Sequence, residues 1–382
     1  MFPLPVTQAV LCLGYSSLDK GLIPDFVIRP VIRALCRQRL REIDTGSFEA
    51  NHAAKMEWIE RARARKAIAD LTEKANKQHY EVSTSFILSC LGPCAKYSSC
   101  FYPTGEETLG EAEVHMLEMY CKNAQLKDGQ DVLDLGCGWG SLTLCLAQAS
   151  LSNGRAETNA DRYHQKYPNS RITALSNSIT QRVHIEETAR CRGITNIEVI
   201  TADINIFDFK GSKHFDRILS IEMFEHMKNY KLLMAKISSW LRPDCAAENA
   251  LVFIQVFCHR TMPYDFEDGN GWMASMFFSG GTMPSHDLLL YFQDDLSLVR
   301  SWYINGRHYA QTCEDWLKRQ DEFGAVGLAT LKMDAEKKGL DGEEGSKMFY
   351  RFRVFYMACA ELFSMNDGQE WGVGHYLFKR KD

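Results

Sequence analysis

The chain has 382 residues, of which 45% are hydrophobic and 24% are charged, and its formal net charge is -5. This balance is typical of a globular protein with a large core and argues against a nucleic acid as the main partner. No apolar run approaches the ~20 residues of a membrane span, and the N-terminus lacks the basic region of a secretory signal, so we expect neither feature.

Thirteen cysteines are scattered through the chain, mostly within apolar segments and without a C-x-x-C pair. This pattern indicates buried thiols in a reducing compartment rather than a disulfide framework. We therefore expect a cytoplasmic protein, and we expect no bound metal.

The first third of the chain is predicted to be helical. Between residues 24 and 43, apolar side chains recur at a helical period, at Val27, Val31, Ala34 and Leu35. We interpret the arginines of this segment as a solvated helix face rather than a membrane or RNA contact. Thr108 and Glu111 form a capping-box pattern, which predicts a helix running toward Cys121.

A glycine-rich stretch, DVLDLGCGWGSL, occupies residues 131–142. Its apolar start, its three alternating glycines and the apolar segment after them predict a strand, a tight turn and a helix N-terminus. Asp134 lies at the strand end, where its carboxylate can accept hydrogen bonds from the turn or from a ligand ammonium. The G-x-G-x-G spacing favours S-adenosylmethionine, with another nucleotide or a vestigial site as the alternatives.

From residue 131 to about 258, strand-like and amphipathic segments alternate, which predicts a doubly wound, mostly parallel α/β sheet. Ligands of such sheets bind at the carboxyl ends of the strands. That rule selects Asn177, Asp203 and Glu222. A polar insertion, Ser152 to Pro168, interrupts the alternation and is interpreted as an exposed loop.

An acidic constellation, SIEMFEHMKNY, follows the fourth strand-like run. If a helix begins there, Glu222, Glu225 and His226 stand at positions i, i+3 and i+4 and share one face. A helix N-terminus with acids placed for the dipole is the structural alternative. The functional interpretation is a site that attracts a cation and accepts a proton from it.

Five segments resemble the coclaurine N-methyltransferase family of plant alkaloid biosynthesis, which is related to cyclopropane fatty-acid synthases: DLGCGWGS, TALSNSITQ, SIEMFEHMKNY, FFSGGTMPS and LLLYFQDD. The similarity runs from about Gly21 to Lys381, except for the insertion. It implies the fold of class I S-adenosylmethionine-dependent methyltransferases. It also implies methyl transfer to an aromatic small-molecule amine of the phenylalkylamine or benzylisoquinoline type, and it leaves homodimerisation open.

The resemblance also assigns site residues. The cofactor positions that it implies are Tyr97, Ser98, Gly136, Gly138, Asn177, Gln181, Asp203, Ile204 and Ile221, and the strand-end position adds Asp134. The amine positions are Tyr80, Glu81, Phe352 and Phe355, with Glu222, Glu225 and His226 as the catalytic group. The alkaloid enzymes often have Trp where this chain has Phe352, which leaves the exact amine open.

Two rival functions stay open. One is a lipid methylase or cyclopropane synthase. Gln255 stands where those synthases hold a bicarbonate base with a His, whereas Cys359 matches a Cys that they carry. The other rival is a non-catalytic cofactor-binding protein, which the presence of the full acidic constellation disfavours.

We expect three regions. A helical N-terminal cover spans 1–120, a Rossmann-like cofactor-binding core spans 121–258, and a substrate-pocket cover with C-terminal elements spans 259–382. Helix-like segments at 312–323 and 348–363 are expected to fold back over the strand ends.

Overall fold

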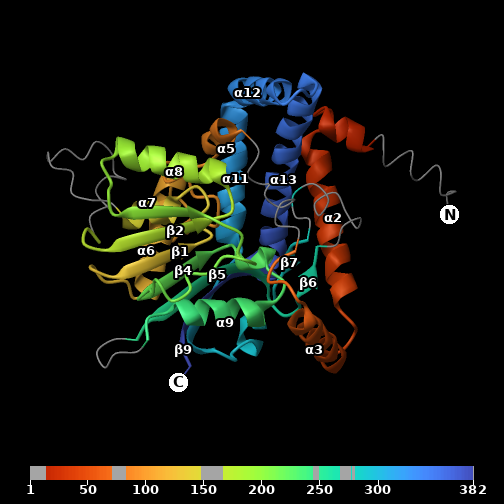
Figure 1. Ribbon diagram of the computed structural model, residues 1–382. Helices are drawn as coiled ribbons and strands as arrows, with labels where there is room; N and C mark the ends of the chain where they lie inside the picture. Colours follow the sequence, from red (N-terminus) through yellow and green to blue (C-terminus); the bar gives the residue numbers. More distant parts are fainter. Residues whose placement is uncertain are drawn as a thin grey trace.

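The computed structural model describes residues 14–70, 83–147, 167–243, 249–266, 277 and 280–381. A seven-stranded sheet with the order β3-β2-β1-β4-β5-β9-β8 lies at the centre (Figure 1). Its strands are β1 (Asp131–Leu135), β2 (Arg171–Ser176), β3 (Ile197–Thr201), β4 (Arg217–Ile221), β5 (Leu251–His259), β8 (Leu296–Ile304) and β9 (Trp371–Arg380). The five strand-like runs of the core region are therefore confirmed.

The sheet is mostly parallel, as predicted. Strands β1 to β5 pair in parallel, and β9 and β8 extend the sheet in antiparallel fashion. Because β8 and β9 follow residue 259, the C-terminal region contributes two strands to the central sheet as well as covering it. The strand order reverses between the neighbouring strands β1 and β4. Their carboxyl ends border this topological switch point, where ligands of such sheets bind.

Side chains alternate between the two faces of the sheet and build two separate cores. On β1, Val132 packs into one hydrophobic cluster and Leu133 into the other. Helices cover both faces: α6 (Leu109–Asn123), α7 (Ser141–Leu146) and α8 (Ile179–Cys191) are on one side and α9 (Tyr230–Trp240) on the other (Figure 1). The α6 helix starts with the predicted capping box, in which Thr108 and Glu111 cap each other's backbone, a device that contributes about 1 kcal/mol.

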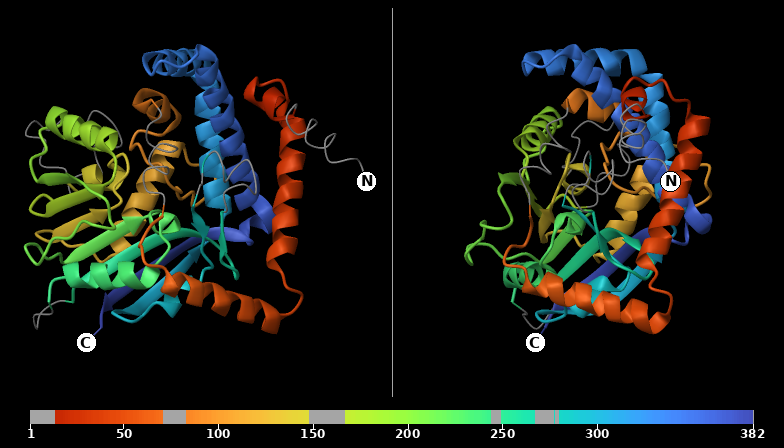
Figure 2. Two further views of the ribbon diagram at one scale, coloured as in Figure 1. Left: turned by 45° about the vertical axis from the view of Figure 1, so that its right-hand side comes forward. Right: turned by 90° about the vertical axis from the view of Figure 1, so that its right-hand side faces the viewer.

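The cover consists of N-terminal and C-terminal helices that stand together at one end of the sheet. The long helix α2 (Asp25–Ile43) packs beside α13 (Gly342–Gly368) and is followed by α3 (Phe48–Ala64), as Figure 2 shows. The remaining pieces of the cover are α5 (Thr84–Cys90), α11 (Arg307–Glu322) and α12 (Gly324–Lys337), with the short elements η3 (Leu288–Tyr291), β6 (Tyr264–Asp265) and β7 (Thr282–Met283). The helix-like segments predicted at 312–323 and 348–363 lie in α11 and α13.

The face that α2 buries differs from the predicted one. Its buried residues are Ile28, Ile32 and Cys36, whereas Val27, Val31 and Leu35 are exposed. Ion pairs help to select this buried face in addition to apolar packing. Arg29 ion-pairs with Glu314 of α11 at 2.6 Å and with Glu361 of α13 at 3.1 Å. The arginines at the start of this helix therefore fix it to the C-terminal cover, and the prediction that they form only a solvated face is wrong for Arg29.

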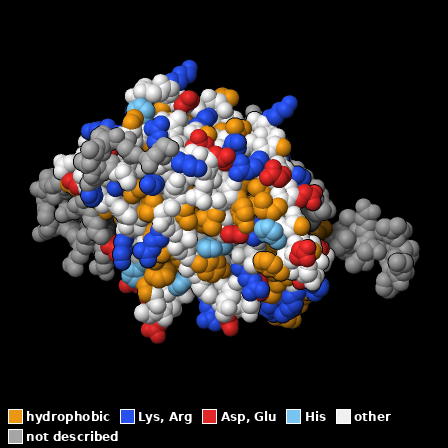
Figure 3. All heavy atoms as spheres, turned by 90° about the horizontal axis from the view of Figure 1, so that it is seen from below, with side chains coloured by type: hydrophobic (Ala, Val, Ile, Leu, Met, Phe, Trp, Pro, Cys, Tyr) orange, Lys and Arg blue, Asp and Glu red, His pale blue; other side chains and the backbone are white. Residues whose placement is uncertain are grey.

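The surface carries interspersed charges. On the face seen from below, basic, acidic and apolar side chains alternate without a large patch of one sign (Figure 3). Some of these charges are paired, since Asp294 lies 3.1 Å from Arg63 of α3 and 3.5 Å from Lys231 of α9. Within the described part of the chain, no helix combines the length and the apolar character needed to cross a membrane.

Candidate active site

The predicted glycine turn forms directly after β1. Gly136 takes φ +85°, and its N–H donates to the Leu175 carbonyl of β2 at 2.8 Å. A Cβ on Gly136 would lie 2.8 Å from the Cβ of Met223, so only glycine lets the turn pass this close. A Cβ on Gly138 would meet no atom within 4 Å, which leaves its bare backbone open to a ligand.

A cleft opens over this turn at the carboxyl ends of the strands. Six of the predicted cofactor residues line it, namely Gly136, Gly138, Asn177, Gln181, Asp203 and Ile204. Glu222 and His226 of the predicted catalytic group line the same cleft. The structure thus brings the cofactor positions and part of the catalytic constellation to one cavity.

The cleft offers a hydrogen-bond donor to a ligand that carries hydroxyl oxygens. The Oε1 atom of Gln181 accepts a hydrogen bond from Ser176 Oγ at 2.7 Å. Its Nε2 atom is buried and has no hydrogen-bond partner among the described residues. A buried amide donor left unpaired is costly, so a ligand oxygen such as a ribose hydroxyl would satisfy it. These residues therefore fit the expected nucleoside cofactor.

Four predicted cofactor residues lie outside the lining of this cleft. Asp134 is buried beneath the turn, where it accepts a hydrogen bond from Thr143 Oγ1 at 2.6 Å, and burial raises its pKa to about 6. This geometry makes Asp134 a support of the strand–helix corner. Ser98 is buried and accepts a hydrogen bond from Lys96 Nζ, whereas the ring of Tyr97 packs against Trp316. Ile221 ends β4 beside Gln255.

The acidic constellation forms a turn instead of the predicted helix. Only Phe224–His226 is helical, as a single 3-10 turn named η2, and the α-helix begins later, at Tyr230. Glu222 has a left-handed backbone with φ +50°, a conformation that costs about 1 kcal/mol or more for a non-glycine residue. The expectation that three residues share one helix face is therefore wrong. They lie close together because the chain bends sharply.

Glu222 is held by three hydrogen bonds from three separate elements. Its Oε1 atom accepts from the backbone N–H of Ser99 at 2.9 Å and from Gln255 Nε2 at 2.8 Å. Its Oε2 atom accepts from the Tyr309 hydroxyl at 2.7 Å. Burial raises the pKa of this carboxyl, while Lys96 and the three donors oppose that rise.

Burial shifts the pKa values of Glu225 and His226 in opposite directions. Glu225 is fully buried, and its Oε1 atom accepts from the backbone N–H of Phe257 at 2.6 Å, while Oε2 has no partner among the described residues. Burial, and then the nearby Glu222 carboxylate, raise the Glu225 pKa well above its ordinary value. Burial, and then Lys228, lower the pKa of His226 to about 4, so its imidazole is neutral at pH 7.

Comparisons with known proteins show which family this chain resembles. A family described as mycolic acid cyclopropane synthetase matches residues 69–370. The (S)-coclaurine N-methyltransferase of Thalictrum flavum subsp. glaucum is 38% identical over 98% of this chain and 97% of its own length. A crystal structure of coclaurine N-methyltransferase bound to N-methylheliamine and SAH is 37% identical, has a TM-score of 0.85, and covers 97% of this chain and 99% of that chain.

The chain belongs to the coclaurine N-methyltransferase family. It is an S-adenosylmethionine-dependent N-methyltransferase with the class I fold, so the predicted family, fold, activity and cofactor are confirmed. The cyclopropane synthase alternative corresponds to more distant relatives. One of them, the cyclopropane-fatty-acyl-phospholipid synthase of Escherichia coli (strain K12), is 27% identical over 78% of this chain and 66% of its own length.

The two predicted aromatic residues of this N-methyltransferase lie on α13 and are not among the residues that line the cofactor cleft. Phe352 and Phe355 are buried and contact Phe277, whose ring stacks on Phe355 at 4.5 Å. They build an aromatic wall in the C-terminal cover. Tyr80 and Glu81, the other two predicted amine residues, lie outside the described part of the chain.

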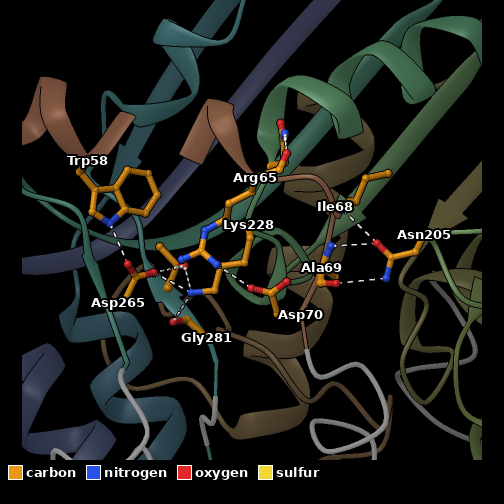
Figure 4. A network of polar contacts seen from close by, with 11 residues as sticks. Trp58, Arg65, Ile68, Ala69, Asp70, Asn205, Lys228, Asp265 and Gly281 are labelled. Carbon is orange, nitrogen blue, oxygen red and sulfur yellow. Dashed lines mark hydrogen bonds and ion pairs between the residues drawn. The ribbon is translucent and has the colours of Figure 1, made fainter. Parts of the chain in front are cut away.

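A segment of the N-terminal cover, residues 65–70, runs past Asn205, as Figure 4 shows. Asn205, which follows β3, accepts hydrogen bonds from the N–H groups of Ile68 and Ala69 at 3.0 and 3.1 Å, and it donates to the Ala69 carbonyl at 3.1 Å. Ala69 and Asp70 then line the cleft. Asn205 is itself oriented, because its backbone N–H donates to Asp203 Oδ1 at 2.8 Å.

An ion pair between a buried lysine and a partly buried aspartate secures the same region (Figure 4). Lys228 Nζ donates to Asp265 Oδ1 at 2.6 Å and to the Gly281 carbonyl at 3.1 Å. Asp265 Oδ2 also accepts from Trp58 Nε1 of α3 at 3.1 Å. The pair therefore ties Lys228, two residues after η2, to both covers.

Sequence reasoning missed several of these residues as parts of the site. They are Ala69, Asp70, Ser99, Asn205, Met223 and Tyr309. Asn205 carries a local signal, since it stands two residues after a strand-end aspartate. Ala69, Ser99 and Tyr309 carry none, because they act through backbone groups or through a contact between residues far apart in the sequence.

Proposed function

We propose that this N-methyltransferase transfers the methyl group of S-adenosylmethionine to an aromatic small-molecule amine of the phenylalkylamine or benzylisoquinoline type. The observation that carries this proposal is the carboxylate of Glu222, which is fixed at the cofactor cleft beside Glu225 and His226. The compounds named for the similar proteins support the substrate class, since (S)-coclaurine and N-methylheliamine are both aromatic tetrahydroisoquinoline amines.

An amine of this kind arrives protonated, because alkylammonium groups have a pKa near ~10. The Glu222 carboxylate attracts the ammonium. When bound, S-adenosylmethionine supplies an electrophilic methyl group, and the amine must lose its proton before its nitrogen lone pair can attack. Much of the rate enhancement comes from holding the two reactants in line.

Two groups are placed to take the proton. His226 is neutral at pH 7 and lines the cleft, so its imidazole can accept a proton directly. Glu225 is a stronger base than an ordinary carboxylate, because burial and Glu222 raise its pKa. We propose that His226 and Glu225 act as a coupled pair while Glu222 anchors the ammonium.

The amine's aryl part would pack on the aromatic wall of α13. Phe352 and Phe355 supply apolar surface, and their ring faces attract a cation, an interaction worth about 0.5–2 kcal/mol. The predicted roles of Tyr80 and Glu81 near the ammonium remain proposals. So do the direct cofactor contacts of Tyr97, Ser98, Asp134 and Ile221.

Methyl transfer from labelled S-adenosylmethionine tests the proposal. The purified enzyme is incubated with phenylethylamines, tetrahydroisoquinolines and benzylisoquinolines, and separately with phosphatidylethanolamine and unsaturated phospholipid vesicles. We expect label in at least one aromatic amine and none in lipid, and no transfer by the Gly136→Val variant. Label only in vesicles would favour lipid methyl transfer, and no label anywhere would favour a non-catalytic protein.

We also propose that the enzyme works in the cytoplasm. All cysteines in the described part of the chain are free thiols, and most of them are buried, which suits a reducing compartment. Fractionation of cells that express a tagged full-length chain tests this location. Homodimerisation stays a prediction. The molar mass in solution, measured by light scattering, decides it.

A further inference from the structure

A line of polar side chains continues from Glu222 into the interior of the sheet. Gln255 Nε2 donates to Glu222 Oε1 at 2.8 Å, and Gln255 Oε1 lies 2.7 Å from His375 Nε2. The other ring nitrogen, His375 Nδ1, lies 3.3 Å from Asn123 Nδ2. Gln255 and His375 are fully buried and face each other as a register pair between β5 and β9.

The chemistry of these groups gives the line one direction. An ionised carboxylate only accepts hydrogen bonds, so Gln255 must turn its amide N–H toward Glu222 and its oxygen toward His375. His375 must then carry its proton on Nε2, and its Nδ1 accepts a hydrogen bond from Asn123. Every donor in the line therefore points toward Glu222.

The surroundings of His375 keep it neutral, with a single N–H. The ring packs against Tyr120 at 5.7 Å and Phe253 at 5.1 Å, and it has no exposed surface. Burial lowers its pKa to about 3, and Lys96 adds to this effect. The single N–H of this neutral ring, carried on Nε2, donates to Gln255 Oε1 and thereby stabilises the amide orientation that serves Glu222.

Other groups also surround the Glu222 carboxylate. Ser99 and Tyr309 donate to it from the loop before α6 and from α11, and Lys96 is a nearby buried cation. Further titratable groups facing it are Glu225 on η2, Tyr120 on α6 and Cys313 on α11. Oε1 has two donors and Oε2 has one, which leaves lone-pair capacity for a substrate N–H, mainly on Oε2.

We propose that His375 and Gln255 are positioning residues that aim the Glu222 carboxylate at the substrate ammonium. His375 fixes the Gln255 amide, and the amide fixes Glu222 in its left-handed backbone conformation. This inference rests on the proposed function, because it concerns how the same site binds a cationic amine.

The binding of a permanent cation tests the inference without the chemical step. Phenylethyl-trimethylammonium has no proton to lose, so the pH dependence of its affinity reports on the protein groups. Calorimetry with the full chain compares wild type with His375→Leu, Gln255→Leu and His375→Gln. The glutamine variant keeps an N–H donor close to the position of His375 Nε2.

We expect His375→Leu and Gln255→Leu to weaken binding of this cation about tenfold at pH 7, as for the loss of one hydrogen bond to a charged group. The midpoint of the pH dependence should also move to higher pH, because Glu222 loses a donor that favours its ionised form. His375→Gln should restore both values. The affinity for S-adenosylhomocysteine should stay unchanged in every variant, which excludes a general loss of structure.

Wild-type affinity and an unmoved midpoint in a folded Gln255→Leu or His375→Leu protein would overturn the inference. If His375→Leu does not fold, Gln255→Leu decides alone, with Asn123→Leu at the far end of the line expected to show a smaller change in the same direction. A wild-type enzyme that methylates no amine would refute the proposed function. Amine methylation together with unaffected variants would refute only the role of His375.

Discussion

Asn205 binds both polar groups of the Ala69 backbone, accepting its N–H at 3.1 Å and donating to its carbonyl at 3.1 Å. A side chain at the end of β3 thereby holds a segment of the N-terminal cover against the cofactor cleft, which Ala69 lines. This pairing of one side chain with the backbone of one residue makes the cleft wall depend on a residue outside the glycine turn.

Asn205→Ala should therefore weaken cofactor binding. It removes three hydrogen bonds to residues 68 and 69, and we expect a roughly tenfold higher Kd for S-adenosylmethionine by calorimetry, the size of one to two net hydrogen bonds. Asn196→Ala is a matched control, because Asn196 also donates to a carbonyl, that of Ser170, but far from the cleft. Equal losses of affinity in both variants would contradict a specific role for Asn205.

Gly136→Val should abolish cofactor binding. A side chain there would start 2.8 Å from the Cβ of Met223, a cleft residue, and at φ +85° it would also strain the turn. Gly129→Ala separates these two causes, since Gly129 has φ +84° but open space around it. We expect the control to keep its affinity for the cofactor and to lose only about 1 kcal/mol of stability. Calorimetric binding by Gly136→Val at wild-type affinity would refute the assignment of the turn.

The pH dependence of methyl transfer should show the loss of the substrate proton. His226 has a pKa of about 4, so it is already neutral and its titration leaves the rate unchanged between pH 6 and 9. The amine, with a pKa near ~10, loses its proton more readily as the pH rises, so the rate should increase across this range. Single-turnover rates at saturating cofactor measure this rise. A flat profile with methyl transfer limiting would mean that no such proton is removed.

The sequence predicted the parts of the site that depend on local pattern. The strand ends and glycine spacing located Gly138, Asn177 and Asp203, because parallel strands bring their carboxyl ends to one edge, and the family resemblance added Gln181. The left-handed backbone conformation of Glu222 could not be predicted from the sequence. Hydrogen bonds from Ser99, Gln255 and Tyr309, which come from distant segments, hold its side chain.

The cover was harder to predict than the sheet, for a similar reason. The apolar period of α2 allowed two choices of buried face, and the choice was made by packing on α13 and by the ion pairs of Arg29. Propensity and periodicity describe one helix at a time and contain no information about its partner. The two C-terminal strands were missed as sheet members because β9 pairs with β5 across more than a hundred residues.

Breaking the Lys228–Asp265 pair, whose lysine is buried, should destabilise the enzyme. Asp265→Ala leaves a buried ammonium with only two neutral partners, a loss for which about 3 kcal/mol is typical. Lys231→Ala is the exposed counterpart, since Lys231 pairs with Asp294 at 3.5 Å on the surface, and it should cost less than about 1 kcal/mol. Urea unfolding measures both variants. Equal midpoints would show that the buried pair adds nothing beyond a surface pair.

Steady-state kinetics can separate the proposed role of Glu222 as an anchor from that of a proton acceptor. Glu222 accepts three protein hydrogen bonds and is best suited to anchor the ammonium, an interaction present in both the ground and the transition state. Glu222→Gln should therefore mainly raise KM for the amine. A proton acceptor works only as the proton leaves, so its loss lowers kcat.

His226→Ala should lower kcat by about 10²-fold or more, the range for a positioned acid–base group. The change leaves Glu222 and its three donors in place, so KM for the amine should change much less than kcat. His184→Ala is the control, because His184 packs its ring on Trp139 of the glycine turn and lies outside residues 222–226. A near-normal kcat for His226→Ala on every accepted amine would assign the proton to another group. Glu225 would then be the first candidate within the described residues, because its raised pKa makes it the more basic of the two carboxyls, and Glu225→Gln would be expected to carry the loss of kcat instead.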